Sequence, residues 1–371
     1  MKIIIIGALP ESLINFRGEL IKKLVNLNHE VITMAAYTDI ETKNRIEKLG
    51  CRYISYPIAR NGINPFSDLK TFMSLVKVFQ KERPNKVIAY TIKPVIWGGL
   101  SANLFSSIQF NALITGLGFA FQSGGFKRNV VKFIAKTLYK GALVSAKSVI
   151  FQNNDNKQTF IQNRIIPHSK AYVVNGSGVN LNYFEHCELP KEPILTFLTI
   201  ARLLGDKGLR EYVSASEIVL KIYPNIRFQI LGPADPSPDG IKIEEVYSWK
   251  NKGLIEYLGN TTDVRPFIRQ CHVFVLASYH EGLPRTVLEA MAIGRPILTT
   301  DVPGCRDTVE EGSNGFLVEK GNAKHLADKM LWFIENPNEL ASMGEASLAF
   351  AQNKYDVNKV NHTICNILEI N

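Results

Sequence analysis

The chain has 371 residues, enough for two domains of ordinary size. Its 46% hydrophobic and 21% charged residues are typical of a soluble globular protein. The longest apolar stretches fall far short of the ~20 residues that span a bilayer. The five cysteines are widely scattered, so they indicate neither a disulfide framework nor a zinc site. We therefore expect a cytoplasmic protein.

The formal net charge of +9 is unevenly distributed. Residues 1–190 contain 24 Lys and Arg against 11 Asp and Glu, a net charge of +13, whereas the rest of the chain has a net charge of −4. This asymmetry predicts that the first half meets an anionic partner, either nucleic acid or anionic lipid.

The first half alternates apolar, strand-like segments with helix-like segments. Pro10 and Glu11 interrupt the first apolar run, which favours a buried strand over a signal peptide. Helices are expected over 15–28, after Asn64-Pro65 and after Pro94. The expected strands cover residues 2–8, 29–36, 51–58, 86–91, 111–115 and 148–153.

The second half repeats this rhythm, which predicts an α/β fold of two Rossmann-like, doubly wound domains. The acidic, proline-containing stretch 187–193 is the expected linker, and the final segment has helical apolar spacing. These features place the domains at 1–190 and 191–345 and a C-terminal helix within 346–371. The expected strands cover residues 195–202, 227–232, 255–259, 273–278, 296–300 and 315–318.

Two glutamates, Glu281 and Glu289, lie eight residues apart in the segment EGLPRTVLEAMAIGRPIL, which follows an apolar strand. A helix that begins near Pro284 would direct free N–H groups and the positive end of its dipole at an anion. Glu289 would lie within that helix and accept hydroxyl hydrogen bonds, and Glu281 would face the group attached to the anion. An anion, a diol and a further polyol together describe a nucleotide sugar.

Two cations, Arg202 and Lys207, follow the first strand of the second half in the segment IARLLGDKGLRE. Ligands of parallel sheets bind beyond the carboxyl ends of the strands. An Arg offers a bidentate fork to phosphate and a Lys offers a point charge. The pair therefore predicts a diphosphate site, with two solvated surface charges as the alternative.

These motifs resemble those of family 4 of the retaining glycosyltransferases, whose signature has two glutamates at this spacing. The resemblance implies the GT-B arrangement, in which two Rossmann-like domains face a cleft and the final helix crosses back to the first domain. It makes 1–190 the acceptor-binding domain and 191–345 the nucleotide-sugar-binding domain. It assigns catalytic roles to Glu281, Arg202 and Lys207. Contacts with the UDP-sugar are implied for Gly7, Arg202, Lys207, Gly232, Leu258, Gly282, Leu283, Pro284 and Glu289.

Three segments of the first half resemble one subgroup of that family. They contain Arg17, the Asn64-Pro65 pair and Thr115-Gly-Leu-Gly118. The subgroup extends sugars linked to undecaprenyl diphosphate and includes bacterial N-acetylgalactosaminyltransferases of O-antigen and N-glycan precursor assembly. Many family members have a His where this chain has Lys93, so a surface lysine remains the alternative there. The expected acceptor contacts are Arg17, Lys93, Thr115 and Gly116.

A basic stripe is expected on a helix near residues 126–142, because four cations recur at every fourth position. Beside aliphatic neighbours, the stripe predicts docking on an anionic membrane, so that the protein is peripheral on the inner face of the cell membrane. An ordinary solvated face is the alternative, and no nucleic-acid motif is present. The four cations are Arg128, Lys132, Lys136 and Lys140.

The predicted function is transfer of a hexose or N-acetylhexosamine, with N-acetylgalactosamine as first choice, from a UDP-sugar to an undecaprenyl-diphosphate-linked sugar. The sequence contains no Asp-X-Asp, so we expect neither a metal nor a cofactor. A UDP-sugar 2-epimerase of the same fold is the alternative, and the basic stripe favours transfer. A non-catalytic sensor would be expected to lack Glu281 or Lys207, and both are present.

Overall fold

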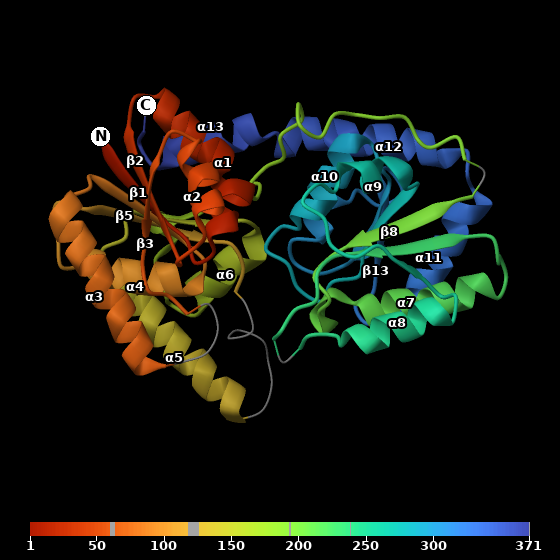
Figure 1. Ribbon diagram of the computed structural model, residues 1–371, viewed down its shortest axis with the longest axis horizontal. Helices are drawn as coiled ribbons and strands as arrows, with labels where there is room; N and C mark the ends of the chain where they lie inside the picture. The colour runs from red at the N-terminus through yellow and green to blue at the C-terminus, as the bar shows by residue number, and fades with distance from the viewer. Residues whose placement is uncertain (60–63, 118–125, 193, 238, 371) are drawn as a thin grey trace. The chain divides into compact units, whose positions relative to one another are not determined.

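The computed structural model describes residues 1–59, 64–117, 126–192, 194–237 and 239–370 (Figure 1). The chain forms two compact units. Unit 1 consists of Met1–Ser177 together with Asn358–Asn371, and unit 2 consists of Gly178–Val357.

Unit 1 is built on a parallel sheet whose strand order is β3-β2-β1-β4-β5-β6-β7. The strands are β1 (Lys2–Ile6), β2 (Glu30–Ala35), β3 (Arg52–Ser55), β4 (Lys86–Tyr90), β5 (Gln109–Ile114), β6 (Ser148–Phe151) and β7 (Ala171–Val173). The helices are α1 (Pro10–Asn26), α2 (Ile40–Glu47), α3 (Pro65–Glu82), α4 (Ile92–Ala102), α5 (Phe126–Leu143), α6 (Asn154–Gln162) and α13 (Val357–Ile367).

Unit 2 has a parallel sheet of order β10-β9-β8-β11-β12-β13. Both sheets therefore run outward in two directions from their first strand, as in the doubly wound Rossmann order. The strands are β8 (Thr196–Ile200), β9 (Arg227–Leu231), β10 (Glu256–Tyr257), β11 (Val273–Leu276), β12 (Ile297–Thr300) and β13 (Gly315–Val318). The α-helices are α7 (Leu209–Leu220), α8 (Ile243–Asn251), α9 (Arg265–Gln270), α10 (Arg285–Ile293), α11 (Ala323–Glu335) and α12 (Glu339–Phe350).

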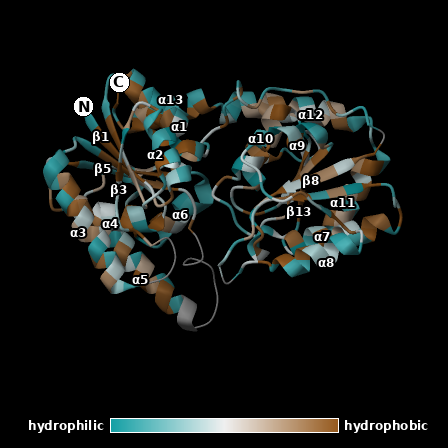
Figure 2. Ribbon diagram, in the orientation of Figure 1, coloured by the Kyte–Doolittle hydropathy of each residue, from teal (hydrophilic) through white to brown (hydrophobic). Residues whose placement is uncertain are grey.

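Each sheet is covered on both faces, which explains its continuous apolar strands. Along β1, Ile4 and Ile6 join one buried cluster, while Ile3 and Ile5 join another. Because successive side chains of a strand point to opposite faces, a strand between two helical layers must be apolar at every position. Figure 2 shows this hydrophobic character along the strands of both sheets. The prediction of two doubly wound α/β domains is thus confirmed.

Cys187 and Glu188, which begin the expected linker 187–193, belong to unit 2. Arg295, which is fully buried, donates hydrogen bonds from its guanidinium to the carbonyls of Cys187 (3.0 Å) and Glu188 (3.1 Å). These contacts hold the main chain of Cys187 and Glu188 against Arg295. The chain passes between the units at 177/178 and again at 357/358, whereas the sequence suggested 190/191 and 345/346.

The two crossing segments are hydrogen-bonded to each other. Val179 N–H donates to the carbonyl of Tyr355 (2.8 Å), and Val357 N–H donates to the carbonyl of Val179 (3.0 Å). After this point α13 joins unit 1, where Val360 and Ile364 pack in the same cluster as Leu20 of α1.

Candidate active site

The predicted donor residues of unit 2 lie along one edge of its sheet. Arg202 follows β8, Gly232 follows β9, Leu258 follows β10, and Glu281 lies in the loop after β11. Because the strands are parallel, their carboxyl ends meet at the same edge, which is where ligands of such sheets bind.

Lys207 and Glu281 form an ion pair at this edge. Lys207 Nζ lies 2.6 Å from Glu281 Oε1, and each side chain is 17% exposed. Burial lowers the pKa of Lys207, but the charge and hydrogen bond of Glu281 outweigh burial and raise that pKa above its usual value. The ammonium therefore stays charged at neutral pH.

The turn that carries Lys207 is held against the loop after β11. Gly208 has a φ of +66°, and a Cβ on it would collide with the carbonyl oxygen of Ala277. Tyr279 N–H donates to the carbonyl of Asp206 at 2.8 Å. These contacts bring together Lys207 and Glu281, although they are 74 positions apart.

Arg202 has a partner that sequence reasoning missed. Its guanidinium pairs with the carboxylate of Asp235, which is 7% exposed in the loop after β9. Ser237 N–H donates to the same carboxylate at 2.9 Å. An Asp followed by Pro and Ser in the loop after a strand was the signal for such a turn.

The helix α10 begins where the sequence predicted, with Pro284 at its N-cap. Glu289 is 6% exposed, and its Oε1 accepts a hydrogen bond from Arg285 Nε at 2.8 Å, one turn earlier. Burial raises the pKa of Glu289, and the charge and hydrogen bond of Arg285 only partly offset that rise.

Gly232 has a structural reason to lack a side chain. Its φ is +152°, and a Cβ would collide with the carbonyl oxygen of Ala201. Its N–H donates to the carbonyl of Gly259 at 2.7 Å. Leu258 is a predicted contact of the nucleotide base, and its N–H already donates to the carbonyl of Ile230 at 2.9 Å.

Gly7, at the end of β1, also has a packing role that the sequence did not indicate. A Cβ on Gly7 would collide with the hydroxyl of Tyr90. Arg17 lies against the same ring, with its guanidinium carbon 5.0 Å from the ring centre. Arg17 is only 2% exposed, so it is a buried part of unit 1 rather than a surface cation.

Lys93 is not a solvated surface lysine either. Its Nζ lies 2.9 Å from Asp68 Oδ1, and the two side chains are 15% and 10% exposed. Thr115 and Gly116 directly follow β5 at the carboxyl edge of the sheet of unit 1, and both are half-buried. Gly118, the last residue of that motif, lies outside the described residues.

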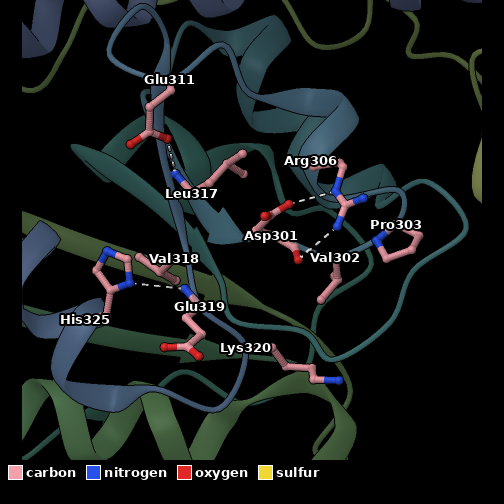
Figure 3. Close-up of a pocket in the computed structure, with 10 residues that line it drawn as sticks. All are labelled: Asp301, Val302, Pro303, Arg306, Glu311, Leu317, Val318, Glu319, Lys320 and His325. Carbon is pink, nitrogen blue, oxygen red and sulfur yellow. Dashed lines mark hydrogen bonds and ion pairs between the residues drawn. The ribbon is translucent and has the colours of Figure 1, made fainter. Parts of the chain in front are cut away.

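A separate pocket of about 660 Å³ lies at the carboxyl ends of β12 and β13 (Figure 3). Its walls combine apolar side chains with polar contacts: Arg306 pairs with Asp301 at 2.7 Å, and Glu319 N–H donates to His325 Nδ1 at 3.2 Å. Lys320, which also lines it, lies 5.9 Å from the ring centre of Tyr279. The pocket therefore adjoins the loop that carries Glu281.

Neither a metal cluster nor a membrane span is found in the described ranges. Their His, Cys, Asp and Glu side chains form no group of three or more that could hold a metal ion. Their helices also lack the combination of length and apolar character that is needed to cross a bilayer.

Comparison with known proteins identifies the family. The model for "Glycosyl transferases group 1" matches residues 185–349, which include Arg202, Lys207, Glu281 and Glu289. The N,N'-diacetylbacillosaminyl-diphospho-undecaprenol alpha-1,3-N-acetylgalactosaminyltransferase of Campylobacter jejuni is 32% identical over 340 residues, which are 88% of this chain and 87% of the relative. The chain belongs to this glycosyltransferase family.

Two further comparisons agree. The UDP-Gal:alpha-D-GlcNAc-diphosphoundecaprenol alpha-1,3-galactosyltransferase of Escherichia coli is 28% identical over 71% of this glycosyltransferase and 70% of the relative. The structure of HepE from Anabaena with UDP and glucose has a TM-score of 0.80 and 18% identity, and covers 100% of this chain and 99% of that one. The structural likeness shows the shared fold. The named relatives are transferases, so the epimerase alternative is not favoured.

Proposed function

We propose that this glycosyltransferase moves a hexose or N-acetylhexosamine from UDP to a sugar linked to undecaprenyl diphosphate, in the assembly of a cell-surface polysaccharide. N-acetylgalactosamine is the first candidate, because the relative with 32% identity is named for it. The observation that carries the proposal is the ion pair of Lys207 with Glu281 beside the N-terminus of α10.

The donor diphosphate would meet Arg202, Lys207 and the main-chain N–H groups of Gly282 and Leu283, with Pro284 fixing the entry to α10. This set combines two fixed cations with the positive end of a helix. Glu289 has two carboxylate oxygens, so Oε1 can keep its bond with Arg285 while Oε2 accepts a ribose hydroxyl. The base would lie over Gly232 and the carbonyl of Leu258.

Transfer would retain the configuration at the anomeric carbon. The bond from that carbon to the diphosphate oxygen breaks, and a bond to the acceptor hydroxyl oxygen forms on the same face. The acceptor proton passes to the departing phosphate oxygen, so no enzymic base is required. Arg202 and Lys207 stabilise the charge that develops on UDP. Glu281 orients the ammonium of Lys207 and accepts hydroxyl hydrogen bonds from the sugar.

The acceptor would bind to unit 1. Thr115 and Gly116 are half-buried at the carboxyl end of β5, where they can meet a sugar or its diphosphate. Lys93 contributes positive charge while it is held in place by Asp68. Arg17 acts indirectly, by packing against the ring of Tyr90.

The helix α5 would dock on the anionic inner face of the cell membrane and so place the protein at its acceptor. Phe133 is 71% exposed and Ile134 is 39% exposed, beside Lys132 and Lys136 of the basic stripe. An apolar face next to cations is the pattern of an interfacial helix. Lys140 is exposed, and the side chain of Arg128 lies outside the described part of the structure.

Incubation with several UDP-sugars and a synthetic polyprenyl-diphosphate sugar tests the proposal. We expect UDP release that depends on the acceptor, and a disaccharide product with the anomeric configuration of the donor by NMR. Conversion of the UDP-sugar without any acceptor would support the epimerase and contradict the proposal.

A further inference from the structure

Three helices of unit 1 line an apolar groove. The helix α4 packs against both α3 and α5, and the groove between them has a volume of about 620 Å³. It is lined by Leu69 and Phe72 of α3, Trp97 and Leu100 of α4, and Leu138 of α5. Its volume lies within the range of about 300–1,000 Å³ that is usual for small-molecule sites.

The walls of the groove offer almost no polar group to a ligand. Of its described lining residues, Asp68 alone is charged, and Lys93 Nζ already bonds to it at 2.9 Å. A polypeptide strand in the groove would leave N–H and C=O groups without partners. A hydrocarbon chain has no such groups, so it fits these walls better.

Lysines accompany the lining residues on two of these helices. The described lysines of α5 are Lys132, Lys136 and Lys140, and the sequence of this helix contains no acid. On α3, the exposed Lys70 directly follows Leu69. Figure 2 shows hydrophobic residues next to hydrophilic ones on both helices. An apolar channel bordered by cations is complementary to an anionic amphiphile.

We propose that this groove binds part of the polyprenyl chain of the lipid-linked acceptor, while the cations of α5 meet its diphosphate. The inference rests on the proposed function, and it adds a site that recognises the lipid rather than the sugar. Hydrocarbon contacts are additive at ~0.8 kcal/mol per buried methylene group, so longer chains should bind more tightly until the groove is full.

The neighbouring residues Leu69 and Met73 provide a matched pair of variants. Leu69 is 53% exposed and lines the groove, whereas Met73 is 50% exposed one turn later on α3 and is not among the lining residues. Because both side chains are half outside the protein, Leu69→Asn and Met73→Asn should fold normally, which circular dichroism can check.

In detergent solution, where no bilayer is present, we expect Leu69→Asn to raise the KM for an undecaprenyl-linked acceptor about tenfold. This is the effect of losing contacts worth about two buried methylene groups. The KM for a water-soluble, short-chain acceptor should not change, and Met73→Asn should behave as wild type with both acceptors. Equal effects of Leu69→Asn on both acceptors, or equal effects of both variants, would overturn the proposal.

The fluorescence of Trp97 gives a direct readout without catalysis. Titration of the full-length protein with geranylgeranyl diphosphate should shift its emission, and Trp97→Phe should remove most of that shift while the ligand still binds. A shift that is unchanged in Trp97→Phe would place the ligand elsewhere and contradict the groove. If wild type shows no transfer to any polyprenyl-linked sugar, the proposed function fails; if it transfers equally well to long and short chains, only the groove fails.

Discussion

Lys207 Nζ and Glu281 Oε1 lie 2.6 Å apart at the carboxyl edge of the sheet of unit 2. The pair joins a cation suited to the donor diphosphate to an acid suited to the donor sugar. Each side chain is largely buried, so neither can lose its partner without leaving a charge poorly compensated. In the proposed site, the pair would therefore couple the part that holds the leaving group to the part that holds the transferred group.

We predict that Lys207→Ala removes roughly 2–4 kcal/mol of transition-state stabilisation, the cost of losing one preorganised charge. Because the two side chains are in contact, the effects of Lys207→Ala and Glu281→Gln should not add in the double variant. Steady-state kcat/KM values for the four proteins measure this coupling. Arg210→Ala, which breaks an exposed pair with Glu245, is the control and should leave kcat/KM unchanged. Additive losses would contradict the shared role.

The ion pair of Arg202 with Asp235 predicts that two variants lose different amounts of kcat/KM. Arg202→Ala should cost about as much as Lys207→Ala, because in the proposed site both charges would meet the diphosphate. Asp235→Asn should cost only about 1 kcal/mol, since Arg202 is 41% exposed and water screens its ion pair. Measurements of kcat/KM with the UDP-sugar test this order of effects. A larger loss for Asp235→Asn than for Arg202→Ala would contradict the prediction.

Glu289 should show opposite effects on stability and on UDP binding. Burial raises its pKa, so its contribution to stability is present while it is protonated and is lost as pH rises through the folded-state pKa. Glu289→Gln stays neutral. In the absence of UDP, the variant should therefore gain stability relative to wild type at about pH 7.5, and this gain should shrink near about pH 4. Its affinity for UDP should fall about tenfold, because a charged hydrogen-bond acceptor is lost.

Thermal unfolding at the two pH values and calorimetry with UDP test both effects. Glu245→Gln is the control of opposite sign, because the hydrogen bond from Arg210 lowers the pKa of Glu245. A lowered pKa gives stability at neutral pH that is lost on acidification, so Glu245→Gln should be less stable than wild type at neutral pH. Its UDP affinity should not change. An unaltered UDP affinity in Glu289→Gln would remove Glu289 from the donor site.

Much of the fold could be predicted from the sequence, because both sheets are covered on two faces and their strands are continuous apolar runs. The strand over 315–318 has the expected bounds. The edge strand β7 was missed, since it has only three residues and Tyr172 and Val173 are more than a third exposed. The helix α1 begins at Pro10 rather than at residue 15, because a proline is tolerated in the first helical turn.

The candidate site was only partly predictable. Ligands of parallel sheets bind beyond the carboxyl ends of the strands. Arg202, Lys207 and Glu281 could therefore be predicted to share one edge of the sheet of unit 2. Their partners were not predictable, because contacts such as Arg202 with Asp235 depend on which strands are neighbours. Gly7 was assigned to the donor by resemblance, although packing against Tyr90 already accounts for its missing side chain.

Activity is expected to persist in EDTA. The proposed site stabilises the departing UDP with Arg202, Lys207 and the N-terminus of α10, so it requires no divalent cation. UDP release with excess EDTA, compared with Mg²⁺ and Mn²⁺ additions, is the measurement. Loss of activity that only a divalent cation restores would contradict this arrangement.

Charge reversal on α5 tests membrane docking. Lys132→Glu with Lys136→Glu should release the protein from anionic vesicles, since each cation near such a surface contributes about 1 kcal/mol of attraction. Binding of wild type should weaken with salt, because the attraction acts within a Debye length of about 8 Å at physiological ionic strength. The variant should transfer more slowly to a long-chain acceptor in vesicles but normally to a short, water-soluble one.

Lys43→Glu with Lys48→Glu is the matched control for this experiment. These two exposed lysines belong to α2 and its C-terminal end, so the control has the same change in net charge without touching α5. If both double variants lose vesicle binding equally, the attraction reflects the overall positive charge of unit 1. If the α5 variant still sediments with vesicles as wild type does, its lysines are an ordinary solvated face. Only selective loss in the α5 variant supports docking through this helix, where the exposed apolar side chains of Phe133 and Ile134 accompany the cations.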